Sequence, residues 1–233
     1  MLYVNVLTLF PAMFPGILGD SIPSKALDNN IWKLNVLDIR SFATDKHAKV
    51  DDVPFGGGAG MVLKADTIDK ALLSLKTVGK IIYVTPRGCV YNQSIAQSIV
   101  KNSIETDNTI TFVCGRYEGI DQRVVEKWSM TEISIGDFVL SGGEGAVQVI
   151  VDSMVRLLPG AVGEYLSIEE ESFQNGLLEY DHYTRPQEWN EVKVPEVLIS
   201  GHHQKIKEWR QKQSEIITQK RRPDLWEQYL KNN

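Results

Sequence analysis

Cysteine is scarce in this chain of 233 residues, which contains only Cys89 and Cys114. Because the two form no Cys-x-x-Cys pair, the sequence indicates neither a disulfide framework nor a four-cysteine zinc site, and a reducing compartment fits best. Long hydrophobic runs are also absent. The apolar run 146–158 is interrupted by Asp152 and Arg156, which makes it too short and too charged to span a bilayer.

The beginning of the chain lacks the basic residues that open a signal peptide, and Asn5, Pro11 and Pro15 interrupt its apolar character. We therefore expect a cytoplasmic protein with no membrane segment. Both common nucleotide fingerprints are missing as well, since no Gly-x-Gly-x-x-Gly opens a helix after a predicted strand and no Gly-x-x-x-x-Gly-Lys-Ser/Thr occurs. Their absence argues against a ligand held through its phosphates and makes a nicotinamide-dependent oxidoreductase the weakest functional alternative.

Strand and helix patterns alternate through the first two thirds of the chain. Segments rich in Val, Ile, Thr and Tyr predict strands at 3–8, 34–39, 80–85, 109–114 and 132–135. Apolar residues at helical spacing predict helices at 66–76, 92–102 and 145–158. This alternation predicts an α/β fold with an open, mostly parallel sheet and helices on both of its faces.

Glycine is concentrated in three loops that follow β-branched runs. Ten of the eighteen glycines lie in 56–60, 115–119 and 136–145. Because glycine has no Cβ atom, such loops let backbone N–H and C=O groups approach a ligand closely. In a parallel sheet the loops 83–86, 115–119 and 134–144 would lie along one edge and form a pocket suited to an adenosine group.

The last third of the chain has an uneven charge distribution, although the net charge of the whole chain is only −5. Residues 161–200 hold nine acidic and two basic side chains, whereas 201–222 hold seven basic and two acidic ones. Together with the change in apolar content, this division predicts a first domain at 1–160, an acidic linker at 161–172 and a small helical domain at 173–233.

The main helix of that last domain is predicted at 203–220, with Ile206, Trp209, Ile216 and Ile217 facing inward and the basic side chains facing outward. Basic side chains on one face can neutralise the phosphates of a nucleic acid and release counterions. The alternative is a helix face that is only solvated. Charge alone does not decide between the two.

Several longer motifs occur in a fixed order along nearly the whole chain. They are Leu9-Phe10-Pro11-x-Met13-Phe14, Asp45-Lys46-His47 before Val50-Asp51-Asp52, Gly56-Gly57-Gly58-x-Gly60-Met61, 114–119, 134–144, His182-Tyr183-Thr184-Arg185-Pro186, Ser200-Gly201-His202-His203 and Arg221-Arg222-Pro223. In kind and order these motifs resemble those of the bacterial tRNA (guanine-N1)-methyltransferases, the TrmD family of the SPOUT superfamily. The resemblance implies a trefoil knot at the end of the first domain that binds S-adenosylmethionine. It also implies a homodimer whose active sites combine residues of both subunits.

The resemblance assigns the cofactor pocket to loops of the first domain. By their places in the motifs, its residues are Tyr83, Val84, Thr85, Pro86, Gly115, Tyr117, Glu118, Ile135, Gly136, Asp137, Phe138, Val139, Leu140, Ser141, Gly142 and Gly143. Backbone groups of 135–140 are expected to hold the adenine ring.

The implied reaction transfers a methyl group from S-adenosylmethionine to N1 of guanosine 37, the nucleotide 3′ to the anticodon of tRNA. N1 carries a proton at neutral pH, so a carboxylate acting as a general base and a guanidinium beside O6 would both assist the reaction. By their places in the motifs these groups belong to Glu171 and Arg156. The family usually has an aspartate where this chain has Glu171, which leaves Glu170 and Asp51 as alternative bases.

The resemblance also gives the basic helix a role in gripping the tRNA. Lys205, Lys207, Arg210 and Lys212 would contact phosphates of the anticodon arm. Assistance by a divalent ion such as Mg²⁺ stays open, because the family suggests it while the sequence contains no metal-ligand constellation. The competing hypothesis is a tRNA-binding protein of the same fold whose methyl transfer is impaired because Glu171 replaces the usual aspartate.

Overall fold

The computed structural model describes residues 1–44, 47–162, 171–173 and 175–232. The chain divides into two compact units, Met1–Gly163 and Glu164–Asn233. Most of the predicted acidic linker, 161–172, lies outside the described residues, so its role as a linker stays a prediction.

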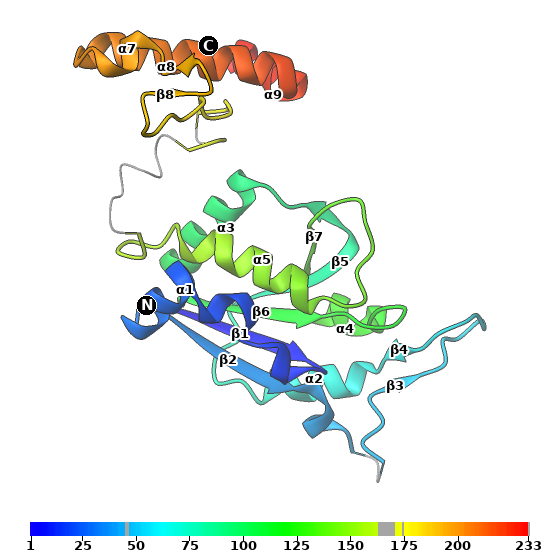
Figure 1. The fold of residues 1–233 in the computed structure, drawn as a ribbon. Coiled ribbons are helices and arrows are strands. Elements are labelled where there is room, and N and C mark those ends of the chain that lie inside the picture. Colours follow the sequence, from blue (N-terminus) through cyan, green and yellow to red (C-terminus); the bar gives the residue numbers. More distant parts are fainter. Residues whose placement is uncertain (45–46, 163–170, 174, 233) are drawn as a thin grey trace. The chain divides into compact units, whose positions relative to one another are not determined.

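The first unit is built on a parallel sheet of five strands in the order β2-β1-β6-β5-β7 (Figure 1). The strands are β1 (Leu2–Thr8), β2 (Trp32–Asp38), β5 (Lys80–Val90), β6 (Thr109–Cys114) and β7 (Thr131–Ser134). Every residue of β6 is buried, as is usual for a strand that has neighbours on both sides and helices on both faces. All five predicted strands are present.

One strand is longer than predicted. β5 continues through Pro86 to Val90, and its pairing with β7 shifts register between Val84 and Cys89. Because proline has no N–H group to give to a neighbouring strand, it is tolerated where the pairing is irregular. The predicted loop 83–86 is therefore a distorted part of the strand.

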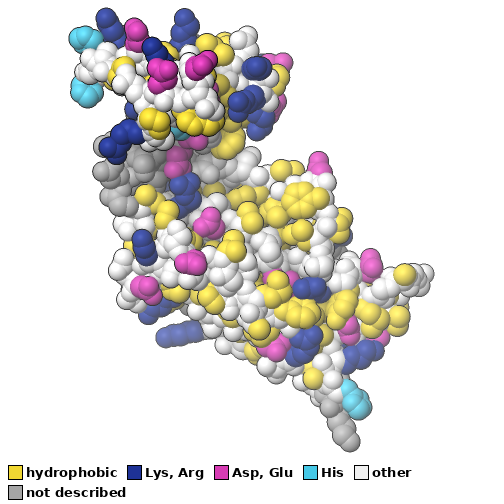
Figure 2. Space-filling model, in the orientation of Figure 1, with side chains coloured by type: hydrophobic (Ala, Val, Ile, Leu, Met, Phe, Trp, Pro, Cys, Tyr) yellow, Lys and Arg dark blue, Asp and Glu magenta, His cyan; other side chains and the backbone are white. Residues whose placement is uncertain are grey.

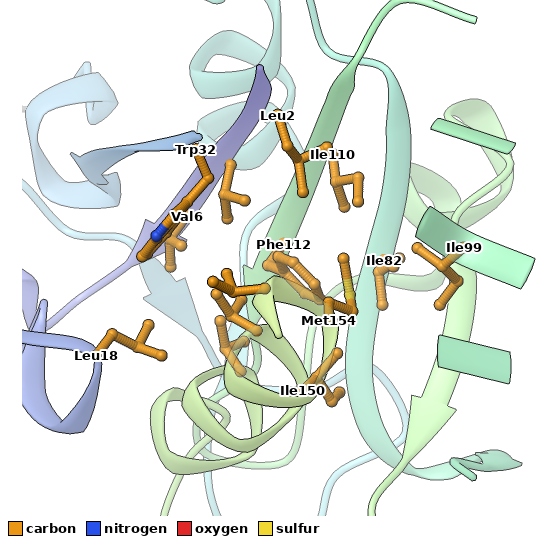
Figure 3. Close-up of a cluster of buried hydrophobic side chains, with 14 of the residues drawn as sticks. Leu2, Val6, Leu18, Trp32, Ile82, Ile99, Ile110, Phe112, Ile150 and Met154 are labelled. Atoms are coloured by element: carbon orange, nitrogen blue, oxygen red, sulfur yellow. The ribbon is translucent and has the colours of Figure 1, made fainter. Parts of the chain in front are cut away.

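Helices cover both faces of this sheet. α1 (Ser21–Asp28), α3 (Gln93–Glu105) and α5 (Glu144–Val155) lie on one face, while α2 (Ala65–Leu73) and α4 (Gln122–Lys127) lie on the other. Short 3₁₀ helices are η1 (Pro11–Met13), η2 (Gly16–Gly19) and η3 (Ile39–Phe42). On the first face Ile99, Ile150 and Met154 share a core with the fully buried Trp32 and Phe112 (Figure 3). The predicted α/β fold with helices on both faces is confirmed.

Helix boundaries follow local capping. The Asn92 side chain accepts a hydrogen bond from the Ile95 N–H group at 3.0 Å, which satisfies a donor in the first turn of α3. The sequence analysis did not predict α1 and α4, because with eight and six residues they are too short for a helical period to stand out. α5 ends at Val155, three residues earlier than predicted.

The glycines of 56–60 lie in a hairpin formed by β3 (Asp51–Asp52) and β4 (Val62–Leu63). The hairpin extends away from the rest of the first unit (Figure 1). It is joined at its base to the loop after β6, because the Glu118 N–H group donates a hydrogen bond to the Met61 carbonyl oxygen at 2.9 Å.

The described part of the second unit contains a short hairpin and helices. They are β8 (Glu188–Trp189), β9 (Val192–Lys193), α7 (Glu196–Ile199), α8 (His203–Arg221) and α9 (Pro223–Asn232). The predicted small helical region is confirmed, but the prediction that Ile216 faces inward is wrong. Ile216 is 46% exposed whereas Ile217 is buried, because adjacent residues of a helix point about 100° apart. Across all described residues, no helix combines the length and the apolar character needed to cross a membrane.

Candidate functional site

A cavity of about 330 Å³ lies at the carboxyl edge of the sheet, beside β5, β6 and β7. Its walls come from the distorted end of β5, the loops after β6 and β7, and the first turn of α5. The lining residues are Tyr83, Val84, Thr85, Pro86, Arg87, Gly115, Arg116, Tyr117, Glu118, Gly119, Ile120, Ile133, Ser134, Ile135, Gly136, Phe138, Val139, Leu140, Ser141, Gly142, Gly143 and Ala146. The predicted segments therefore surround a single cavity.

Fifteen of the sixteen residues predicted to bind the cofactor line this cavity. The exception is Asp137, whose side chain is exposed in the loop after β7. Arg116, Gly119 and Ser134 also line the cavity; they lie in the loops predicted to form the pocket but were not assigned to the cofactor. Arg87, Ile120, Ile133 and Ala146 line it from outside the predicted loops, and each is within three residues of one of them.

The loops after β6 and β7 touch each other through their backbones. The Gly143 N–H group donates a hydrogen bond to the Gly115 carbonyl oxygen at 3.0 Å. A Cβ atom built on Gly143 would lie 2.9 Å from Cys114 Cα, closer than real Cβ atoms approach other atoms. Gly143 therefore permits a contact that a side chain would prevent, and this contact fixes one wall of the cavity.

Exposed apolar side chains line part of the cavity. Phe138, Val139 and Leu140 are 53%, 84% and 45% exposed. The loop that carries them is ordered at its start, where the Ser134 hydroxyl donates a hydrogen bond to the Gly136 carbonyl oxygen at 3.0 Å. Neighbouring exposed apolar side chains commonly mark a binding site, and here they adjoin a cavity lined by backbone groups.

The cavity is lined by two arginines and one carboxylate. Arg87 forms an ion pair with Glu132 at 3.1 Å, and Arg116 forms one with Glu144 at 3.3 Å. Within the described residues the Glu118 carboxylate has neither an ion pair nor a hydrogen bond. It is therefore the group in the cavity that is best placed to receive a cationic part of a ligand.

Two other titratable groups beside the cavity stay protonated at neutral pH. Burial raises the pKa of the Tyr83 phenol. Burial, and next the charge of the neighbouring Glu144 carboxylate, raise the pKa of the Cys114 thiol well above its usual range. Neither group supplies an anion, so a general base acting here has to be a different side chain.

The predicted catalytic residues are not brought together by the first unit. Arg156 follows the last residue of α5, whereas Ala146 in the first turn of that helix lines the cavity. Arg156 follows Ala146 by ten positions, which at 1.5 Å per residue correspond to about 15 Å along the helix. Glu171 belongs to the second unit and is half-buried. Of the alternative bases, Asp51 lies in β3, and Glu170 lies outside the described residues.

The predicted RNA-contacting residues all lie on α8. Lys205, Lys207 and Lys212 are exposed, and Figure 2 shows Lys and Arg side chains interspersed with Asp and Glu over the C-terminal helices. Arg210 differs because it is half-buried, with its Cζ atom 4.9 Å from the centre of the Tyr180 ring. Such a cation–π contact stabilises the unit itself, so Arg210 presents less of its side chain to a partner than predicted.

A buried network beside the cavity was missed by the sequence analysis. Glu144, the first residue of α5, is fully buried, and it pairs with Arg116. The hydroxyl group of Thr8, the last residue of β1, donates a hydrogen bond to Glu144 Oε1 at 2.7 Å. The sequence carried no clear signal for it, because an acidic residue in the first turn of a helix is common at exposed positions as well.

Comparisons of the sequence with known proteins identify its family. A family profile described as "tRNA (Guanine-1)-methyltransferase TrmD" matches residues 2–228. The chain is 58% identical over 226 residues to the tRNA (guanine-N(1)-)-methyltransferase of Rhodospirillum rubrum. The aligned region covers 97% of this chain and 92% of the relative. It is 51% identical over 233 residues to the protein of the same name from Pelagibacter ubique, with 100% of both chains covered. The chain therefore belongs to the TrmD family and is a methyltransferase.

Proposed function

We propose that the chain transfers the methyl group of S-adenosylmethionine to N1 of guanosine 37 in tRNA. The observation that carries this proposal is the cavity at the carboxyl edge of the sheet, which gathers fifteen of the sixteen residues predicted to bind the cofactor. The names of the relatives from R. rubrum and P. ubique, both tRNA (guanine-N(1)-)-methyltransferases, support the substrate class. A trefoil knot formed by the cavity loops and a cytoplasmic location are parts of the same proposal.

The cavity fits S-adenosylmethionine in size and in chemistry. Its volume of about 330 Å³ is in the range of small-molecule sites, roughly 300 to 1,000 Å³. Backbone groups of 135–140 would hold the adenine ring, and the Glu118 carboxylate would pair with the ammonium group of the methionine part. When bound, the cofactor supplies an electrophilic methyl group. In the described residues no group of three or more His, Cys, Asp or Glu side chains is placed to hold a metal ion, so we assign no residue to Mg²⁺.

Two side chains carry the proton transfer and charge stabilisation in this proposal. The Glu171 carboxylate accepts the proton of guanine N1, which turns N1 into a nucleophile. Negative charge then spreads to O6, where the Arg156 guanidinium donates hydrogen bonds to it. The raised pKa values of Tyr83 and Cys114 support a carboxylate in the role of base.

The position of Arg156 supports a homodimer with shared active sites. Within one chain Arg156 is separated from the cavity by most of the length of α5. A second copy of the chain would supply its own Arg156 to the cavity of the first, as the family resemblance implies. Each active site would then need two chains.

The direct test is methyl incorporation into two tRNA transcripts that differ only at nucleotide 37. With saturating S-adenosylmethionine we expect the transcript with guanosine 37 to gain one methyl group at N1 and the transcript with adenosine 37 to gain none. If the protein binds both transcripts and leaves guanosine 37 unmodified, the enzyme proposal is wrong and the hypothesis of a binding protein with impaired chemistry replaces it.

Gly143→Ala is expected to weaken S-adenosylmethionine binding by about tenfold to hundredfold, because the added methyl group collides with the backbone at Cys114 and displaces a wall of the cavity. Isothermal titration calorimetry measures the dissociation constant. Gly145→Ala is the matched control, since a Cβ at Gly145 meets no atom within 4 Å. Equal affinity in the two variants would contradict the placement of the cofactor.

Replacing Lys205, Lys207 and Lys212 together by alanine is expected to weaken tRNA binding and to reduce its salt dependence. Three lost phosphate contacts lower the slope of log K against log salt concentration by about 2 to 3. Filter binding over a range of salt concentrations measures this slope. A control with the same change in charge removes three exposed lysines of the first unit, Lys25, Lys33 and Lys101. An identical slope in both triple variants would show that α8 makes no phosphate contacts.

A further inference from the structure

The buried network next to the cavity connects the ends of three strands. The Phe10 N–H group donates a hydrogen bond to the Thr8 hydroxyl oxygen at 2.9 Å, and the same hydroxyl donates to Glu144 Oε1 at 2.7 Å. The other carboxylate oxygen of Glu144 lies 3.3 Å from Arg116 Nη2. Arg116 Nη1 donates in turn to the Ser141 carbonyl oxygen at 2.7 Å. The connection thus runs from the end of β1, through the start of α5, to the loops after β6 and β7.

Two further contacts involve the Arg116 side chain of this network. The Cζ atom of Arg116 lies 4.2 Å from the centre of the Phe10 ring, so the guanidinium also packs on an aromatic face. A Cβ atom built on Gly142 would lie 2.2 Å from Arg116 Nε and 2.6 Å from Glu144 Oε2. The backbone at Gly142 therefore packs directly on the ion pair.

Burial makes the network dependent on all of its members. The side chains of Glu144 and Arg116 are 1% and 17% exposed, and Thr8 is fully buried. Removing one partner of a buried charge leaves the other unpaired in a site from which water is excluded, and this is strongly unfavourable. Loss of the Thr8 hydroxyl therefore disturbs Glu144, which holds Arg116, which holds the carbonyl group of Ser141.

Only one end of the network, formed by Arg116 and its partner Ser141, reaches the cavity. Arg116, Ser141 and Gly142 line it, whereas Thr8 and Glu144 are not among the lining residues. We propose that the Thr8–Glu144–Arg116 network is a brace that holds the loop 136–143 at the spacing which S-adenosylmethionine binding requires, so that Thr8 is a positioning residue. The proposal rests on the function proposed above.

The test compares isosteric substitutions at two buried threonines. Thr8→Val removes the hydroxyl and keeps the shape, and Thr8→Ser keeps the hydroxyl. Thr111→Val is the structural control, because Thr111 is also fully buried and its hydroxyl donates a hydrogen bond to the Val78 carbonyl oxygen at 2.6 Å, away from the cavity lining. We expect Thr8→Val alone to raise the dissociation constant for S-adenosylmethionine about tenfold. With saturating cofactor its kcat should stay within about twofold of the unmodified chain.

A second readout does not depend on the cofactor. In the ligand-free protein, amide hydrogen exchange across 138–143 should be faster in Thr8→Val than in Thr8→Ser or Thr111→Val. If exchange and cofactor affinity in Thr8→Val equal those of Thr111→Val, the brace is wrong. If the unmodified chain itself fails to bind S-adenosylmethionine, the proposed function is wrong. The comparison of hydrogen exchange then still shows whether the network holds the loop 136–143. Should Thr8→Val not fold, Glu144→Gln replaces it, with the same expected loss of affinity.

Discussion

Glu171→Gln is expected to lower the rate of methyl transfer about 10²- to 10⁴-fold while the affinity for S-adenosylmethionine stays the same. The amide has nearly the shape of the carboxylate but cannot accept the N1 proton of guanine. Burial raises the pKa of the Tyr83 phenol and of the Cys114 thiol at the cavity, so neither of these two groups supplies an anion that could replace the lost base. Single-turnover methylation with saturating cofactor and tRNA measures the effect.

Two further substitutions, one at Glu171 and one at Glu170, test whether the base is the Glu171 carboxylate. Glu171→Asp keeps a carboxylate on a stem that is one methylene shorter and restores the residue that the family usually has, so most of the rate should be retained. Glu170→Gln removes the adjacent charge and should leave the rate close to that of the unmodified chain. A fast Glu171→Gln together with a slow Glu170→Gln or Asp51→Asn would move the role of base to the slow position.

Arg156→Ala is expected to lower kcat about 10²- to 10³-fold, the usual effect of removing a donor that stabilises developing negative charge. Cofactor affinity should be unchanged, because the proposed partner of the Arg156 guanidinium is O6 of the guanine and not S-adenosylmethionine. Arg156→Lys serves as the partial control, since an ammonium group keeps the charge but not the planar fork of donors. An Arg156→Ala variant with full activity would exclude this residue from the reaction.

Mixing two variants tests whether the active sites are shared, provided that the S-adenosylmethionine concentration saturates the unmodified cavity but not the cavity of Gly143→Ala. One chain carries Arg156→Ala and keeps its cavity, and the other carries Gly143→Ala and keeps its arginine. In a mixed dimer with shared sites, one site combines the intact cavity with the intact arginine. A random mixture should therefore recover about a quarter of the full activity. If each site lay within one chain, every site in the mixture would carry one lesion and activity would not return.

The sheet was predictable from sequence because its strands have a strong local signal. Val recurs in β1, and Thr, Ile, Val and Phe make up most of β6, and such residues are enriched in strands. The two-residue strands of the hairpin at β3 and β4 have no comparable signal, since their pairing depends on the chain around them. The continuation of β5 past Pro86 was also hidden, because it depends on a register shift against β7.

The cavity was largely predictable, and the network behind it was not. Glycine-rich motifs identify residues that need close backbone contact, and such motifs can be found without knowing their partners. The hydrogen bond from Thr8 to Glu144 joins positions 136 residues apart. The local sequence around each of the two residues does not predict that they are in contact, because the contact depends on the fold. For the same reason the contact of Arg210 with Tyr180 could not be foreseen from the charge of α8.

The small core of the second unit has a consequence for release of the product. Among its described residues only Leu177 and Ile217 are buried hydrophobic side chains, whereas the first unit has a core on both faces of its sheet. Segments with so few buried contacts open at a small fraction of the global unfolding free energy. In the proposed function, part of the free energy of tRNA binding would then go into keeping this unit folded, which would shorten the residence time that its charges alone would give and let the modified product leave sooner.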